Sequence, residues 1–129
     1  NADAFNQDLS SWNVARVTKM NSMFSWARAF NQDVSSWDVS SVLDMREMFS
    51  YAPVFNQPLS HWNVSSVTDL RGMFRHAGAF NQDLSTWDTS SGPLVSGHMY
   101  SSIFDSAYAF NQDLSDWDVS LISDMQHSS

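Results

Sequence analysis

Aspartate side chains recur in rows along this sequence and offer its clearest chance of metal chemistry. Asp38, Asp88 and Asp118 each follow a tryptophan, with Asn13 and Asn63 at the equivalent places. Ca²⁺ is bound by six to eight oxygens, which carboxylates and carbonyls can supply. No D-x-[DN]-x-[DN]-G loop accompanies these residues. The sequence therefore predicts no metal site. If Ca²⁺ is bound, Asp38, Asp88 and Asp118 are the candidate ligands; the alternative role of these residues is to cap turns.

Other reactive groups show no catalytic spacing. The four histidines, His61, His76, His98 and His127, are scattered, and no H-E-x-x-H or zinc pattern contains them. There is no G-x-S-x-G elbow, cysteine is absent, and only four glycines are present. These observations predict neither an enzyme nor a cofactor.

The whole chain consists of a repeated sequence unit. The triplet Phe-Asn-Gln starts at Phe5, Phe30, Phe55, Phe80 and Phe110, so the period is 25 residues with one interval of 30. Such a period is typical of solenoids and arrays. We expect residues 1–129 to form one segment, with four complete units and a truncated fifth, that belongs to a longer array. Ser90 to His98 interrupt the pattern, which predicts a surface loop that is either a tolerated insertion or a contact with a partner.

Each unit combines two apolar rhythms. Leu9, Trp12 and Val14 flank short polar residues, which is typical of a short strand with one buried face. The next residues place Met20, Met23, Phe24 and Ala27 at i, i+3, i+4 and i+7, the stripe of a short helix. Pairs such as Ser41 with Asp44 resemble a helix cap. The pattern predicts an α/β repeat of strand–turn–short-helix units, with parallel strands stacked in one sheet.

Two columns are predicted to be structural. The tryptophans alternate with polar residues and are expected in the core: Trp12, Trp37, Trp62, Trp87 and Trp117. The asparagines that follow phenylalanine are expected to bond up and down the stack through their amides: Asn6, Asn31, Asn56, Asn81 and Asn111.

The outward positions of the predicted strands form a candidate binding surface, which we call the polar face. Its residues are Ser36, Asp38, His61, Asn63, Thr86, Asp88, Asp116 and Asp118. They are small, polar and acidic, so a hydroxyl-rich glycan or a basic protein surface fits them better than an apolar ligand. The net charge of −8 argues against nucleic-acid binding, which needs a basic footprint. No apolar run in this segment is long enough to span a membrane.

The unit F-N-Q-D-L-S-x-W-[DN]-V-S-x-V-x-x-M-x-x-M-F-x-x-A resembles the repeat of BspA-like leucine-rich-repeat surface proteins. That group is also described as a mycoplasma domain of unknown function and as a lipoprotein repeat. The resemblance implies a right-handed, leucine-rich-repeat-like solenoid, a place at the cell surface or outside the cell, adhesion or interaction roles, and no catalysis.

Residues and resemblance together predict a non-catalytic interaction module of a cell-surface or secreted protein, with a protein or a glycan as its partner. The alternative is a structural spacer or assembly subunit within a larger complex.

Overall fold

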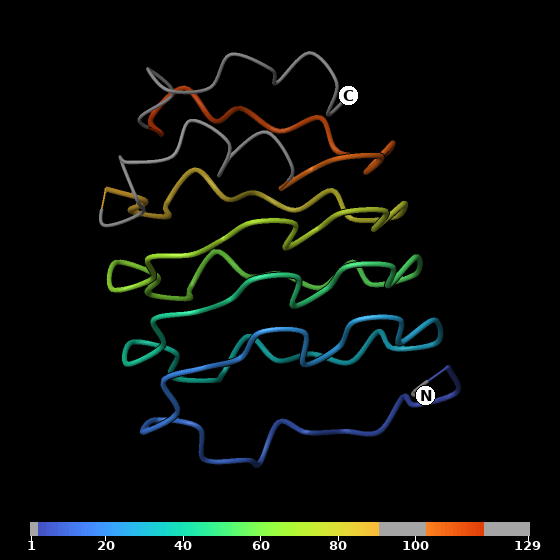
Figure 1. The fold of residues 1–129 in the computed structure, drawn as a ribbon, viewed down its shortest axis with the longest axis horizontal. Coiled ribbons are helices and arrows are strands. Elements are labelled where there is room, and N and C mark those ends of the chain that lie inside the picture. Colours follow the sequence, from blue (N-terminus) through green and yellow to red (C-terminus); the bar gives the residue numbers. More distant parts are fainter. Residues whose placement is uncertain (1–2, 91–102, 118–129) are drawn as a thin grey trace.

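The computed structural model describes residues 3–90 and 103–117. The chain runs across the molecule and back, and each passage lies on the one before it, from the blue N-terminal part to the orange part (Figure 1). We call each passage a coil, so that the first to fifth coils start at Phe5, Phe30, Phe55, Phe80 and Phe110. Equivalent residues of neighbouring coils are in contact, as the backbone of Asn31 donates to the Asn6 side chain 25 residues earlier.

The prediction of an α/β solenoid with helices and a parallel sheet is wrong. The described residues contain no helix and no strand, and their only bridges are two isolated parallel ones, Lys19 with Asp44 and Asp44 with Asp69. Turns, joined by residues without regular secondary structure, make up the coils instead. The burial pattern that suggested strands and helices is nevertheless present, so the period was correct for burial and misleading for backbone conformation.

The segment predicted as a strand consists of turns. In the second coil, the N–H of Trp37 donates to the carbonyl of Val34 at 3.1 Å, and the N–H of Val42 donates to that of Val39 at 3.0 Å. Short polar side chains stabilise the bends, because the Asp33 and Asp38 carboxylates accept the N–H of the residue two positions later. Such local bonds compete with a sheet ladder. These local bonds explain why a segment with alternating apolar residues forms turns here and not a strand.

The segment predicted as a helix is a chain of overlapping turns. In the second coil, the N–H groups of Met48, Ser50 and Ala52 each donate to the carbonyl three residues earlier. Glu47 and Tyr51 have φ of 56° and 57°, which a right-handed helix excludes. They occupy the third position of their turns, where a type II turn requires positive φ. The proposed cap residue Asp44 accepts the N–H of Arg46 in a local bend.

The backbone N–H and carbonyl groups that are not bonded within these turns form hydrogen bonds to the neighbouring coils. The N–H groups of Glu47, Phe49 and Tyr51 donate to carbonyls of the third coil at 2.7–2.9 Å. The carbonyls of Arg46, Met48 and Ser50 accept N–H groups of the first coil at 2.8–2.9 Å. Alternate residues therefore bond within the coil and between coils. This satisfies the polar backbone without regular secondary structure.

Stacked side chains fill the interior between the two halves of each coil. The apolar stripe of the second coil, Met45, Met48, Phe49 and Ala52, is fully buried. Phe49 lies 4.0 Å from Phe55 in ring centroids, and 5.5 Å and 5.7 Å from Phe24 and Phe74 of the adjacent coils. The core is therefore continuous from coil to coil, which couples the stability of each coil to its neighbours.

The tryptophan column is buried except at its first member. Trp37, Trp62, Trp87 and Trp117 are at most 4% exposed, whereas Trp12 on the first coil is 52% exposed. Each buried indole N–H donates to a carbonyl of the preceding coil, as from Trp62 to Val34 at 3.0 Å. The prediction that Trp12 lies in the core is wrong, because in the described structure no coil covers it.

The asparagine column forms a side-chain ladder. The backbone N–H of Asn31 donates to Asn6 Oδ1 at 2.9 Å, and the same bond recurs at Asn56, Asn81 and Asn111. The following glutamine of the second to fifth coils donates Nε2 to the same asparagine oxygen, as Gln57 does to Asn31 at 3.1 Å. The last rung joins residues 30 apart with the same 2.9 Å length. The predicted loop Ser90–His98 lies outside the described residues apart from Ser90.

Candidate functional site

The described residues of the polar face are all exposed: Ser36, Asp38, His61, Asn63, Thr86, Asp88 and Asp116. Several of their side-chain oxygens have partners within the fold. Asp38 Oδ1 accepts the N–H of Ser40 at 3.0 Å and its hydroxyl at 2.6 Å, and Asp88 does the same with Ser90. The Thr86 hydroxyl donates to the Ser60 carbonyl of the preceding coil at 2.7 Å. The polar face therefore shapes its own turns. Asp118 lies outside the described residues.

The calcium candidates are not brought together within the described chain. Asp38 and Asp88 lie two coils apart, with Asn63 between them in the same column. Across residues 3–90 and 103–117, no three histidine or acidic side chains are grouped so that they could hold a metal ion. Turn capping is the role that the geometry assigns to Asp38 and Asp88.

Turn hydrogen bonds hold the pKa of the exposed aspartates below the ordinary value. The Ser40 hydroxyl and then its backbone N–H lower the pKa of Asp38, and Ser90 acts in the same way on Asp88. Serine two positions later also lowers the pKa of Asp8, Asp33, Asp83 and Asp113. Because a lowered pKa means that the folded state favours the ionised form, ionisation of these groups stabilises the fold.

We expect the free energy of unfolding to fall in acid. The contribution of these aspartates is present above the unfolded pKa, near 3.8, and is lost as the pH falls through their lower folded values. Urea unfolding from pH 6 to pH 2.5 should therefore show a plateau and then a decline below about pH 4. Asp88→Asn keeps the acceptor oxygen, as Asn63 does naturally, and should reduce the slope of the decline. An identical slope in that variant would contradict this origin.

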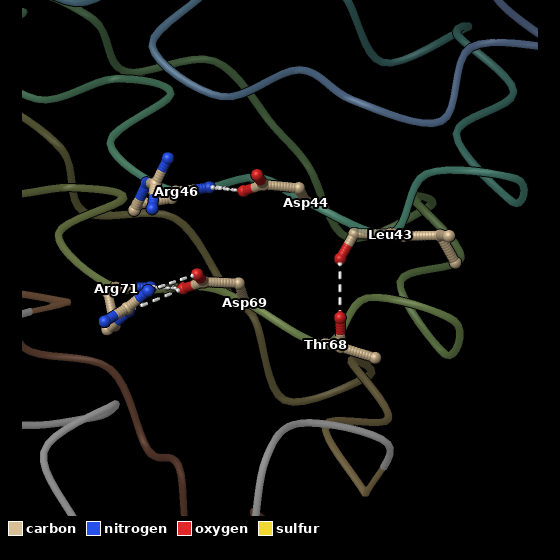
Figure 2. A network of polar contacts seen from close by, with 6 residues as sticks. All are labelled: Leu43, Asp44, Arg46, Thr68, Asp69 and Arg71. Atoms are coloured by element: carbon tan, nitrogen blue, oxygen red, sulfur yellow. Dashed lines mark hydrogen bonds and ion pairs between the residues drawn. The ribbon is translucent and has the colours of Figure 1, made fainter. Parts of the chain in front are cut away.

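A polar network joins the second and third coils beside the two bridges (Figure 2). The Arg71 guanidinium donates to both carboxylate oxygens of Asp69, at 3.0 and 2.7 Å, and the Thr68 hydroxyl donates to the Leu43 carbonyl at 3.1 Å. Burial raises the pKa of Asp69, but the hydrogen bonds and charge of Arg71, with the charge of Arg46, outweigh it and leave the pKa lowered. This network fixes the local conformation of both coils.

Arginines gather next to this network. Arg46, Glu47, Arg71, Gly72 and Arg75 line a hollow of about 170 Å³. Two of the three guanidiniums are already paired, Arg71 with Asp69 at 2.7 Å and Arg75 with Asp105 at 3.2 Å, and Glu47 adds a further negative charge. The charges in this hollow are therefore largely compensated, and it offers little net attraction to an anion.

Aromatic side chains form a row on the surface of the segments that were predicted as helices and that consist of overlapping turns. Trp26, Tyr51 and His76 stack with ring centroids 4.0 and 4.4 Å apart and planes inclined by 3° and 20°. Trp26 is 46% exposed, and the other two are partly exposed. We call these three residues the ring row. All three have positive φ, between 56° and 63°, so the backbone turns each of them outward at the same place in its coil.

The sequence prediction did not include the ring row as a site. Its one sequence signal was Trp26, which stands outside the regular tryptophan column. Tyr51 and His76 occupy the same place in the next two coils but share only aromatic character with Trp26. A repeat in identical residues does not reveal a column that is filled by three different rings.

A pocket of about 230 Å³ lies beside the ring row. It is lined by the three rings and by Arg28 and Pro53. The Arg28 guanidinium carbon lies 5.6 Å from the centroid of the Trp26 ring, within the range of a cation–π contact. Arg28 also lies 3.8 Å from Asp3, an exposed pair that contributes little energy. The pocket thus combines aromatic surface with few competing charges.

The histidines of the described chain are not arranged for catalysis. His61 is exposed on the polar face and His76 belongs to the ring row, while His98 and His127 lie outside the described residues. Within the described part of the chain, no helix is long and apolar enough to cross a membrane.

One comparison with known proteins gives a match. The family model described as Mycoplasma protein of unknown function, DUF285, matches residues 1–87 and, in a second overlapping match, residues 59–128. Neither a curated protein nor a solved structure matches the chain.

Proposed function

We propose, on the premise that this chain belongs to the family described as Mycoplasma protein of unknown function, DUF285, that it is a non-catalytic interaction module. The proposed setting is a cell-surface or secreted protein, and the partner is a protein or a glycan. The similarity of the repeat to that of BspA-like surface proteins supports the location. The family match itself carries no activity.

The observation that carries the proposal is the ring row. Trp26, Tyr51 and His76 come from three coils, yet they present stacked rings at one place on the surface. Tryptophan and tyrosine combine a large apolar body with a polar tip and are enriched where proteins bind partners. The polar face lacks such anchors, and one side-chain oxygen of Asp38, of Asn63 and of Asp88 is engaged in a turn. We therefore assign the contact surface to the ring row.

A binding experiment with matched variants tests this assignment. The labelled chain is applied to arrays of purified secreted proteins and of glycans. The double variant Trp26→Ala, Tyr51→Ala should bind at least tenfold more weakly than the wild type to whatever the wild type retains. Leu43→Ala removes an apolar side chain that is 47% exposed outside the row and should stay within twofold.

Circular dichroism confirms that each variant is folded before binding is compared. A wild type that binds neither array would overturn the proposed function. Binding that the double variant retains in full would instead remove the ring row as the site.

A further inference from the structure

We propose that the pocket beside the ring row binds a neutral carbohydrate chain. This inference rests on the proposed binding function and specifies the ligand of the same site. The pocket is lined by Trp26, Arg28, Tyr51, Pro53 and His76. Its size, the geometry of its rings and its charge each narrow the class of ligand.

The pocket is a small concavity that is open to solvent. Its volume of about 230 Å³ lies below the range of roughly 300–1,000 Å³ for sites that enclose drug-sized molecules. A single ring-sized unit fits such a space. A longer ligand contributes one unit at a time and continues along the surface.

The stacking of the rings determines which part of them a ligand meets. Centroid separations of 4.0 and 4.4 Å leave no room for a further planar ring between them, since packed carbons need about 3.5–4.0 Å on each side. Intercalation of a nucleobase or another flat aromatic is thereby excluded. The stack offers mainly ring edges, which carry the positive part of the aromatic quadrupole. Hydroxyl oxygens are attractive partners for such edges, and the three ring types also carry N–H or O–H groups.

The charge around the pocket favours a neutral ligand. No carboxylate lines it, so a basic peptide finds no counter-charge there. Arg28 is the one lining residue with a permanent charge, and the chain as a whole carries −8, which disfavours an anionic polymer. A neutral, hydroxyl-rich ligand meets no such penalty. Carbohydrate combines neutrality, hydroxyl groups and ring-sized units.

Gly78 provides a place from which to obstruct the pocket. It follows His76 by two residues, as Arg28 and Pro53 follow Trp26 and Tyr51, so it occupies their position in the third coil. A Cβ added there meets no atom within 4 Å. Gly78→Leu therefore extends a side chain beside the ring row without disturbing the core, and Gly78→Ala is its small control.

The experiment is calorimetric titration of the folded chain with three probes: neutral hexose oligosaccharides of two to six units, a uronic-acid oligosaccharide and a proline-rich peptide. We expect the neutral oligosaccharides to bind, with affinity that rises with length. Tyr51→Phe keeps the ring stack and removes one hydroxyl, so it should weaken binding several-fold, up to about tenfold. Gly78→Leu should weaken binding at least tenfold, and Gly78→Ala by less than twofold.

The other outcomes overturn the inference in distinct ways. Tighter binding of the uronic-acid probe contradicts the neutral ligand, and binding of the peptide alone contradicts carbohydrate. Both leave an interaction function standing. Neutral oligosaccharides that bind equally to Gly78→Leu would place their site elsewhere. If the chain binds proteins on the arrays but no glycan, the carbohydrate inference fails and the proposed function survives.

Discussion

Replacing Trp62 by alanine is expected to lower the free energy of unfolding by about 3–5 kcal/mol. Trp62 is 2% exposed, its ring lies 6.5 Å from that of Trp37, and its indole N–H donates to the Val34 carbonyl. The truncation leaves a cavity and removes the bond to the preceding coil. Urea unfolding monitored by circular dichroism measures the loss.

Two variants separate these contributions. Trp62→Phe retains much of the ring volume and loses the indole N–H, so it should cost clearly less than alanine. Trp12→Ala changes the same column where the side chain is 52% exposed, and its cost should be the smallest of the three. A loss below about 1 kcal/mol for Trp62→Ala would be incompatible with a tryptophan column that is buried and stabilises the fold.

Proline at position 47 is expected to destabilise the fold by about 3 kcal/mol or more. Glu47 has φ of 56°, whereas proline fixes φ near −65°, and its N–H donates to the Arg71 carbonyl at 2.9 Å. Both the conformation and the bond between coils are lost. The Glu47 side chain is exposed, so little of the effect comes from packing. The midpoint of urea unfolding checks the prediction.

Glycine at the same position is the informative control. In the interior of a helix, glycine costs about 1 kcal/mol relative to alanine. At positive φ it relieves roughly 1–2 kcal/mol of strain, against about 0.5–1 kcal/mol of added freedom in the unfolded chain. Glu47→Gly should therefore leave stability unchanged or raise it by up to about 1 kcal/mol. Gly72 already takes this role in the third coil, with φ of 65°. A clear loss in Glu47→Gly would favour a helical conformation.

The sequence was informative about which side chains are inside. The stripe Met45, Met48, Phe49 and Ala52 is buried as its spacing predicts. The same spacing also fits a chain of turns, because in both cases the side chains three and four residues apart return to one side. Periodicity reports the direction of side chains, and backbone conformation requires a second signal.

The residue types at the turn positions did not provide this second signal. A type II turn usually has glycine at its third position. Here Ser22, Glu47, Trp26 and Tyr51 stand in such positions, and each donates its N–H to the following coil. Bonds between coils compensate for the strain, so the turn positions need no glycine. Contacts between residues 24 or more positions apart thus decide a local conformation, which a window of sequence does not contain.

The candidate site was predicted only in part for a related reason. The polar face was found because its residues alternate with the core, and its described members are indeed exposed. The ring row depends on three different residues whose common feature is a positive φ. The surface on which the proposed function rests became visible only with the backbone.

The interval of 30 residues leaves the geometry of the stack unchanged. The Asn111 N–H lies 2.9 Å from Asn81 Oδ1, as in the shorter intervals, and the rings of Phe74 and Phe104 are 5.7 Å apart, the same distance as Phe49 and Phe74. The described residues on either side of this interval therefore keep the register of the 25-residue intervals. Register in this stack is thus set by contacts between side chains of neighbouring coils and not by equal spacing along the chain.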